Sequence, residues 1–203
     1  MPSRRSAIGI FDSGIGGLTV VREVLKLLPS EPVVYLGDTA RVPYGNKSKE
    51  TVLKFSTENV LFLLNYQVKL IIVACHTSSS LALKNLARHF KQPILGVVEP
   101  GVEAALRATR LGRIGVIGTK ATVSSQAYSA AIAKRSSRTQ VFQAACPLFV
   151  PLAEEGWQEE SVAEQVAHRY LKPLKAARVD TLILGCTHYP ILKKIIARTM
   201  GPK

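Results

Sequence analysis

Residues 70–80 have the sequence LIIVACHTSSS, in which an apolar run gives way to a cysteine, a histidine and hydroxyl side chains. Residues 181–190, TLILGCTHYP, repeat this pattern much later in the chain. Short apolar runs that are rich in β-branched residues and end in small polar residues are typical of buried strands in parallel sheets. Each stretch therefore predicts a buried strand that ends in a cysteine.

Apolar runs of the same kind recur along the whole chain. Together with the two above, they predict strands over 7–11, 32–37, 70–75, 93–98, 113–118, 139–145 and 181–186. The segments between them carry apolar residues at spacings of three and four, which predicts helices over 18–28, 49–66, 80–90, 102–111, 124–135 and 160–174. This alternation of strand and helix is typical of a doubly wound α/β architecture with mainly parallel sheets.

The same order of landmarks occurs twice. Cys75 follows Ile8, in the first predicted strand, by 67 residues, and Cys186 follows Ile114, in the fifth, by 72 residues. Each half of the chain thus supplies one cysteine at the carboxyl end of a strand. Ligands of open parallel sheets bind outside those carboxyl ends. The pattern indicates a duplicated unit with one cysteine in each copy.

The boundary between the copies is expected near VVEPG at 97–101, where a proline and a glycine break the pattern. We therefore predict two pseudo-symmetric α/β domains, 1–98 and 99–203. The active site of such a pair is expected in the cleft between the domains, because a cleft on a pseudo-twofold axis presents both cysteines to one substrate.

Composition sets broad limits on the class of protein. A chain of 203 residues that is 47% hydrophobic fits a soluble globular protein with a proper core. The first apolar run, 7–11, is cut short by Asp12 and glycines, so it predicts neither a secretory signal nor a membrane span. Three cysteines are an odd number that suits a reducing compartment. We expect a cytoplasmic protein with no membrane partner.

The formal net charge of +13 is a hypothesis about partners, because a strongly positive field attracts nucleic acids and anionic small molecules alike. The basic residues are scattered through helix-like segments and are not interleaved with aromatic residues. This distribution favours a solvated basic surface over a dedicated nucleic-acid site.

The stretch FDSGIGGLTV, residues 11–20, runs from a predicted strand through glycines into a predicted helix. A dinucleotide fingerprint would require glycine at Thr19, although Asp38 lies where a ribose-binding acid belongs. An ordinary turn capped by Asp12 or Ser13 is a second interpretation. A small-anion site that uses Asp12 and Ser13 is the third.

Cys75 and Cys186 are each followed by residues that could start a helix, and a thiol at a helix N-terminus has its pKa lowered toward neutrality. Taken singly, a cysteine at a strand end is usually an inert packing residue. Cys146 is followed by proline and is predicted to be structural. The spacing of cysteines and histidines argues against zinc. A nucleophilic pair of cysteine and histidine would need only one of the two cysteines.

Two reactive thiols suit a reaction that inverts a carbon centre. One group removes a proton from one face while the other delivers a proton to the opposite face. A cysteine pKa of about 8.5, tuned by its surroundings, can lie near the operating pH, where general acid–base catalysis is most effective. The residues therefore predict proton exchange next to a carboxylate, in a site lined by hydroxyl and N–H donors.

These motifs resemble those of the glutamate racemases. The resemblance covers the whole chain and rests on six motifs in order: IGIFDSGIGGLTV, YLGDTARVPYG, ACHTSS, GVIGTKATV, ACPLFVPLAEEG and LGCTHYP. It implies a cofactor-independent amino-acid racemase with no metal, which interconverts L- and D-glutamate for bacterial peptidoglycan and hence for cell wall and cell shape. Glutamate is the implied partner, and a homodimer is compatible with the resemblance.

The resemblance also implies roles for individual residues. Cys75 and Cys186 match the two catalytic cysteines. The implied substrate-binding residues are Asp12, Ser13, Tyr44, Gly45, His76, Thr77, Thr187 and His188. Asp12 is expected near the substrate ammonium, and Tyr44 with Gly45 in a loop that holds a carboxylate. Supporting roles fall to Glu154, which with His188 and Asp12 would assist the thiols, and to Thr119 and Thr122.

The chain departs from the family at two points. The family usually has asparagine where His76 stands, so an amide is replaced by an imidazole that is either charged or neutral. Family members typically continue past the final TMGPK for several dozen residues, which complete the first domain. The alternative from another functional class is a binding protein: a catalytically impaired member of the family that contacts DNA or gyrase through its basic surface. Aspartate racemase is the related-enzyme alternative.

Overall fold

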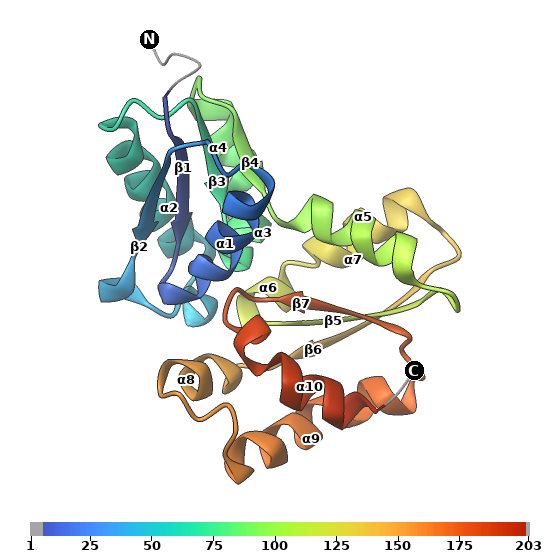
Figure 1. Ribbon diagram of the computed structural model, residues 1–203. Coiled ribbons are helices and arrows are strands. Elements are labelled where there is room, and N and C mark those ends of the chain that lie inside the picture. Colours follow the sequence, from blue (N-terminus) through green and yellow to red (C-terminus); the bar gives the residue numbers. More distant parts are fainter. Residues whose placement is uncertain (1–5, 202–203) are drawn as a thin grey trace. The chain divides into compact units, whose positions relative to one another are not determined.

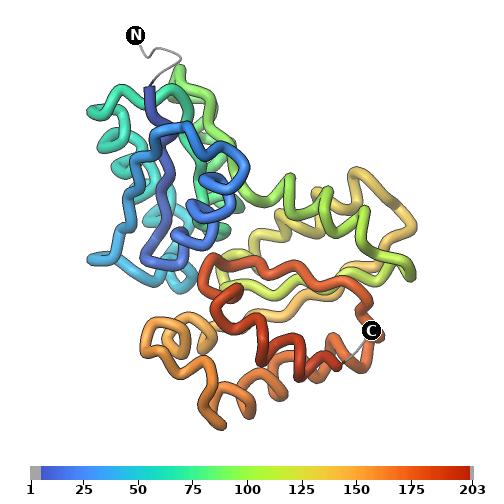
Figure 2. The backbone as a smooth tube through the Cα atoms, in the orientation of Figure 1, coloured from blue at the N-terminus to red at the C-terminus, as the bar shows by residue number. Residues whose placement is uncertain are grey.

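The computed structural model describes residues 6–201, which fold as two compact units. The N-terminal unit comprises Met1–Val97 and the C-terminal unit Val98–Lys203. The expected domains 1–98 and 99–203 include residues 1–5 and 202–203, which lie outside the described residues. In Figure 2 the colour runs from blue to green through the first unit and from green to red through the second, so each is one uninterrupted stretch of chain.

The N-terminal unit alternates strands and helices as predicted (Figure 1). Its elements are β1 (Ile8–Asp12), the 3₁₀ turn η1 (Ile15–Gly17), α1 (Leu18–Leu27), β2 (Val33–Gly37), η2 (Thr39–Arg41), η3 (Tyr44–Asn46), α2 (Lys49–Leu64), β3 (Leu70–Val73), α3 (His76–Leu81), α4 (Leu83–His89) and β4 (Ile94–Gly96). The strands form one parallel sheet in the order β2-β1-β3-β4.

The C-terminal unit has the same plan. Its elements are α5 (Val98–Ala108), β5 (Arg113–Gly118), α6 (Lys120–Ser124), α7 (Ala127–Arg135), β6 (Gln140–Ala145), α8 (Phe149–Glu154), α9 (Ser161–Ala176), β7 (Thr181–Gly185), η4 (Tyr189–Leu192) and α10 (Lys193–Met200). The strands form a parallel sheet in the order β6-β5-β7. All seven predicted strands are confirmed, and so is the predicted α/β class with parallel sheets.

Helices cover both faces of each sheet. On β1, Phe11 faces α2 and α4, whereas Ile8 and Ile10 face α1, because successive strand side chains point to opposite faces. On β5, Ile117 faces α9 and α10, whereas Ile114 and Val116 face α5 and α7. Burial of each such aliphatic side chain stabilises the fold by roughly 1.5–3 kcal/mol. Coverage on both sides explains why the central strands are apolar throughout rather than alternating.

The first three strands of each unit share one topology, and β4 of the N-terminal unit extends its sheet beyond β3. In each unit the first strand is central, the second strand pairs with one edge of it and the third with the other. The cysteine of each unit directly follows the third strand, β3 or β7. Cys75 and Cys186 therefore occupy equivalent topological positions, in agreement with the repeat seen in the sequence.

Several helix boundaries were predicted incorrectly. The expected helix over 80–90 is two helices, α3 and α4, divided at Ala82. The expected helix over 124–135 is interrupted at Gln126, whose φ of 56° is left-handed and cannot continue an α-helix. The expected break at 97–101 is instead the first turn of α5, where proline is tolerated because its missing N–H would lack an intrahelical partner anyway.

Helix α8 was not predicted, because it has only six residues and contains a proline. None of the helices within residues 6–201 is long and apolar enough to cross a membrane.

Candidate active site

Three polar side chains of the N-terminal unit lie at the carboxyl edge of its sheet. Asp12 ends β1, Asp38 follows β2, and Cys75 follows β3. The parallel register pairs Asp12 with Gly37 and Phe11 with Val73, so the chain leaves all three strands at the same level. The edge that the sequence predicted for ligand binding therefore carries a carboxylate and a thiol side by side.

Asp12 fixes the turn that follows β1. Its carboxylate is fully buried and accepts hydrogen bonds from the backbone N–H groups of Gly14, at 3.1 Å, and Gly17, at 3.0 Å. A Cβ atom at Gly17 would lie 2.4 Å from the Cβ of Asp12, so only glycine fits there. The interpretation of Asp12 or Ser13 as the helix cap was wrong, because the N-cap residues of η1 and α1 are Gly14 and Gly17 and no side chain caps either helix. The Asp12 carboxylate instead holds the turn between β1 and α1 through these two N–H groups.

The pKa of Cys75 differs from the sequence expectation. Burial raises the pKa of the Cys75 thiol, and the carboxylate of Asp12 raises it further. Hydrogen bonds from the backbone and hydroxyl of Ser78 and from Ser13 act in the opposite direction and are weaker. The predicted lowering of the pKa at the start of α3 was wrong, because a helix of six residues offers too little positive potential to outweigh burial beside a carboxylate.

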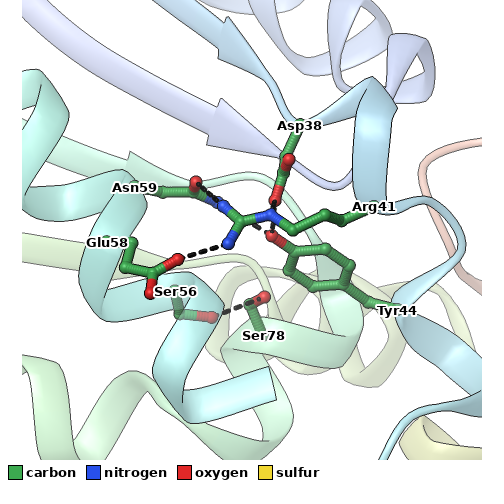
Figure 3. Close-up of polar contacts among 7 residues, drawn as sticks. All are labelled: Asp38, Arg41, Tyr44, Ser56, Glu58, Asn59 and Ser78. Carbon is green, nitrogen blue, oxygen red and sulfur yellow. Dashed lines mark hydrogen bonds and ion pairs between the residues drawn. The ribbon is translucent and has the colours of Figure 1, made fainter. Parts of the chain in front are cut away.

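Tyr44 packs beside Cys75, and a polar network holds its hydroxyl (Figure 3). The hydroxyl donates to the carboxylate of Asp38 and accepts from Nδ2 of Asn59 at 3.0 Å. Arg41 donates from Nε to Asp38 at 2.7 Å and from Nη2 to Asn59 at 3.2 Å, and it forms an ion pair with Glu58. Burial and the adjacent Asp38 raise the pKa of Tyr44 well above its ordinary value.

This network leaves the Tyr44 hydroxyl engaged inside the protein. The neighbouring Gly45 is also buried, in the 3₁₀ turn η3. Arg41, Glu58 and Asn59 were not identified from the sequence, because their pairing depends on α2 lying against the loop 38–46, which no local pattern encodes.

His76 and Thr77 begin α3, directly after Cys75. Thr77 is buried, and burial lowers the pKa of the partly buried His76 to about 4. The imidazole that replaces the family's asparagine is therefore neutral at pH 7. Ser78, in the next position, accepts a hydrogen bond from Ser56 of α2 at 2.9 Å and was missed as a thiol partner. Its only sequence signal was its place in the run of hydroxyls after the cysteine.

The C-terminal unit presents its own thiol at the carboxyl edge. Gly118 pairs with Gly185, so Thr119 and Cys186 leave the sheet side by side. Nδ1 of His188 lies 3.7 Å from Sγ of Cys186, and Nε2 lies 2.5 Å from Oε1 of Glu154. When Nε2 carries the proton and donates a hydrogen bond to the Glu154 carboxylate, Nδ1 is left as an acceptor toward the thiol. The three side chains form a line from carboxylate through imidazole to thiol.

Three threonines lie at the same edge of the sheet as this thiol. Thr119 caps α6, because its Oγ1 accepts from the backbone N–H of Thr122 at 3.1 Å and its hydroxyl donates to Oγ1 of Thr122 at 3.0 Å. Thr187 follows Cys186 and is buried. The structure thus brings together Thr119, Thr122 and Thr187 with Cys186 at one edge of the sheet.

Cys146 has different surroundings. It is fully buried among apolar side chains, burial raises its pKa to about 12, and its backbone carbonyl accepts a hydrogen bond from the Tyr189 hydroxyl at 2.8 Å. A thiol in such a place is inert. Within the described residues, no three His, Cys, Asp or Glu side chains lie close enough to hold a metal ion.

Each unit therefore holds one thiol with polar partners that can influence proton transfer. Cys75 has Asp12, Ser13 and Ser78 around it, whereas Cys186 has the imidazole of His188 backed by Glu154. Ser13 and Thr119 occupy equivalent positions after the central strands. The arrangement suits acid–base chemistry more than nucleophilic attack, because both thiols are buried and neither is isolated from a proton acceptor.

Comparisons with known proteins agree with this geometry. A glutamate racemase from Geobacter metallireducens is 54% identical over 195 residues, which cover 96% of this chain and 72% of that protein. The crystal structure of a glutamate racemase isoform from Bacillus anthracis superposes with a TM-score of 0.95 at 40% identity, over 98% of this chain and 75% of that one. The glutamate racemase from Francisella tularensis, crystallised with D-glutamate, has a TM-score of 0.90 at 41% identity, over 96% and 73%.

The chain thus spans about three quarters of the length of these relatives. The sequence model of the Asp/Glu/Hydantoin racemase family matches residues 8–203, which include both cysteines and all their polar neighbours described above. On this match and these identities, the chain belongs to the family of Asp/Glu/Hydantoin racemases.

Proposed function

We propose that this protein interconverts L- and D-glutamate by a two-base mechanism in which Cys75 and Cys186 act on opposite faces of the α-carbon. The observation that carries the proposal is the equivalent topological position of the two thiols, each after the third strand of its sheet. The choice of glutamate rests on relatives that are named glutamate racemases and on the one crystallised with D-glutamate.

The proton balance of the reaction is simple. For one enantiomer, the thiolate of Cys186 removes the α-proton, and the electron pair of the broken C–H bond stays on the α-carbon, next to the carboxylate. Cys75 then gives its S–H proton to the opposite face. The net change is an inverted carbon, with the proton moved from one thiol to the other. For the second enantiomer the two roles are exchanged, so no cofactor is needed.

The surroundings of the two thiols favour a protonated Cys75 and a deprotonated Cys186 at the start of this reaction. The raised pKa of Cys75 keeps that thiol protonated in the free protein, which makes it the acid. Nδ1 of His188, oriented by Glu154, is the acceptor that can take the proton of Cys186 and make it the base.

The substrate groups have matching partners among the residues at the sheet edges. The buried carboxylate of Asp12 is proposed to bind the substrate ammonium. The positive charge of the ammonium would compensate the cost of burying the carboxylate. The backbone at Tyr44 and Gly45, held by the Asp38 network, is proposed to receive a substrate carboxylate. Neutral His76, Thr77 and Thr187 are proposed as further hydrogen-bonding contacts.

The test is α-proton exchange of the 203-residue chain in heavy water. L- or D-glutamate should lose its α-proton signal in NMR spectra while the circular dichroism of the amino acid decays to zero. Cys75→Ser and Cys186→Ser should abolish racemisation, and Cys146→Ala should retain it. Folded protein that exchanges neither enantiomer, or that exchanges aspartate faster than glutamate, would contradict the proposal.

We also propose that the D-glutamate serves bacterial peptidoglycan synthesis in the cytoplasm, as the resemblance implies. The chain should then restore growth of a bacterial strain that requires external D-glutamate. The matched control is Cys186→Ser, which should not restore growth although it differs by one atom.

A further inference from the structure

The two thiols lie beside groups that act differently on a thiolate. Cys186 has Nδ1 of His188 at 3.7 Å, whereas Cys75 lies beside the buried carboxylate of Asp12, which raises the pKa of its thiol. Two negative charges repel strongly in a buried site. In the proposed reaction Cys75 must nevertheless become a thiolate, because it removes a proton from one enantiomer and gives a proton to the other. Hydrogen-bond donors around its sulfur therefore decide how readily Cys75 ionises.

Ser78 is placed to act on the sulfur of Cys75. Cys75 is the N-cap residue of α3, and Ser78 is the third residue of that helix. The side chain at the N-cap lies next to the third helical residue, as in a capping box. Ser78 is fully buried and Cys75 is 4% exposed, so solvent has little access to the space between them. The hydrogen bond from the Ser78 hydroxyl lowers the pKa of Cys75, against the effect of Asp12.

Ser56 of α2 fixes the direction in which the Ser78 hydroxyl donates. Oγ of Ser56 donates to Oγ of Ser78 at 2.9 Å, and both residues are fully buried (Figure 3). A serine hydroxyl has one hydrogen and two lone pairs. Because Ser78 accepts the hydrogen of Ser56, its own hydrogen is left to be donated to the sulfur of Cys75. Hydrogen bonds in such a chain polarise one another, so Ser56 also makes Ser78 a stronger donor.

Helix α2 is held against this site by its other side chains. Phe55, the residue before Ser56, packs against the cluster that contains Tyr44 and Cys75. Asn59, nearly one turn after Ser56, donates from Nδ2 to the Tyr44 hydroxyl at 3.0 Å. These contacts keep Ser56 in place when the charge on the sulfur changes.

We propose that the Ser78 hydroxyl, oriented by Ser56, stabilises the thiolate of Cys75 and thereby sets the strength of Cys75 as a base. When the S–H bond of Cys75 breaks and its proton goes to the α-carbon, the electron pair stays on the sulfur. The O–H group of Ser78 donates a hydrogen bond to this charge and keeps its own proton. Ser78 thus acts on a reacting atom, and Ser56 is a positioning residue. The catalytic consequence rests on the proposed two-base function, whereas the effect on the thiol does not.

The first test measures the thiol rather than the reaction. Alkylation of the whole chain by iodoacetamide at pH 8, followed by mass spectrometry of each cysteine, reports how readily each thiol ionises. Ser78→Ala should slow alkylation of Cys75 about tenfold, because a hydrogen bond to a charged group is lost. Cys186 in the same sample should keep its wild-type rate. Ser56→Ala should slow alkylation of Cys75 about threefold, since the Ser78 hydroxyl remains but is less polarised.

The matched control is Ser79→Ala, at the next position of α3. The Ser79 hydroxyl bonds backbone groups: it donates to the carbonyl of Val73 at 2.8 Å and accepts from the N–H of Val97 at 3.2 Å. Its loss should lower the free energy of unfolding in urea denaturation and leave the alkylation rate of Cys75 within about twofold. Equal slowing by Ser79→Ala and Ser78→Ala overturns the proposal, as does a wild-type rate in the Ser78→Ala protein.

The second test follows the reaction. In Ser78→Ala the α-deuterium isotope effect should rise mainly for the enantiomer whose proton Cys75 removes, because that proton transfer becomes slower. An isotope effect that rises mainly for the other enantiomer overturns the catalytic role of Ser78. Wild-type protein that does not racemise glutamate contradicts the proposed function alone, since slower alkylation of Cys75 in Ser78→Ala still supports the effect on the thiol. Racemisation together with unchanged alkylation overturns this inference alone.

Discussion

The carboxylate of Glu154 lies 2.5 Å from Nε2 of His188, on the opposite side of the imidazole from Cys186. His188 is almost fully buried, so the ring is held between an acceptor and a thiol with little access for water. Such a carboxylate fixes the tautomer and the orientation of the imidazole, so that Nδ1 faces the thiol as an acceptor.

Glu154→Gln should lower kcat for glutamate racemisation by roughly 10- to 100-fold, because the imidazole loses the carboxylate that fixes its tautomer and keeps Nδ1 as the acceptor toward Cys186. Both directions slow equally in kcat/KM, since the two enantiomers have equal free energies. The α-deuterium isotope effect should rise mainly for the enantiomer whose proton Cys186 removes. Glu155→Gln, at the exposed neighbouring position, is the control. An equal change of the isotope effect for both enantiomers would contradict the role of Glu154.

Cys146→Ser should separate stability from activity. The substitution buries a hydroxyl in the apolar core and should reduce the free energy of unfolding by about 1–3 kcal/mol. Racemisation at 25 °C should stay near the wild-type rate, because the Cys146 carbonyl that accepts from Tyr189 is unchanged. Urea denaturation and the exchange assay measure the two effects. Loss of activity in a folded Cys146→Ser protein would mean that the thiols have been assigned incorrectly.

Acidification should destabilise the protein through His76. Burial lowers its folded pKa to about 4, below the unfolded value of about 6.5, so the unfolded chain binds the proton first. Its contribution is fully present above pH 6.5 and is lost as the pH falls toward 4. The loss should be on the order of 1–3 kcal/mol, since the side chain is only partly buried.

This prediction is measured by urea denaturation between pH 7 and pH 4. His76→Asn should flatten the decrease in stability, because asparagine does not titrate. His89→Asn, at an exposed position at the end of α4, should leave the decrease unchanged. A wild-type slope in the His76→Asn protein would show that the imidazole is not buried.

Tyr44→Phe should weaken substrate binding more than it slows the chemical step. Removal of the hydroxyl leaves the buried Asp38 carboxylate and the Asn59 amide each without one partner, at a cost of about 1–3 kcal/mol of stability. The loop that carries Gly45 then loses its support, so KM for glutamate should rise several-fold with kcat within about threefold. Tyr66→Phe, at an exposed position, should change neither. A fall in kcat at unchanged KM would place Tyr44 in the chemistry instead.

The sequence determined the fold to a large extent. Seven apolar runs located all seven strands, and their alternation with helical patterns indicated parallel sheets, because periodicity and β-branched content are local properties of the chain. It also located the thiols at strand ends, since a strand boundary is visible where apolar residues stop. Short helices such as α8 escaped because six residues hold less than two turns of periodic pattern.

The tertiary structure decided what each side chain can do. Glu154 and His188 are 34 residues apart and meet only because α8 packs near the end of β7. The pKa of Cys75 rises, against the expectation from its place before a helix, because Asp12 from another strand shares its buried site. Burial and electric field are sums over groups brought together from distant parts of the chain, so the sequence alone specified the strands and the residue types but not the charge state of the thiol.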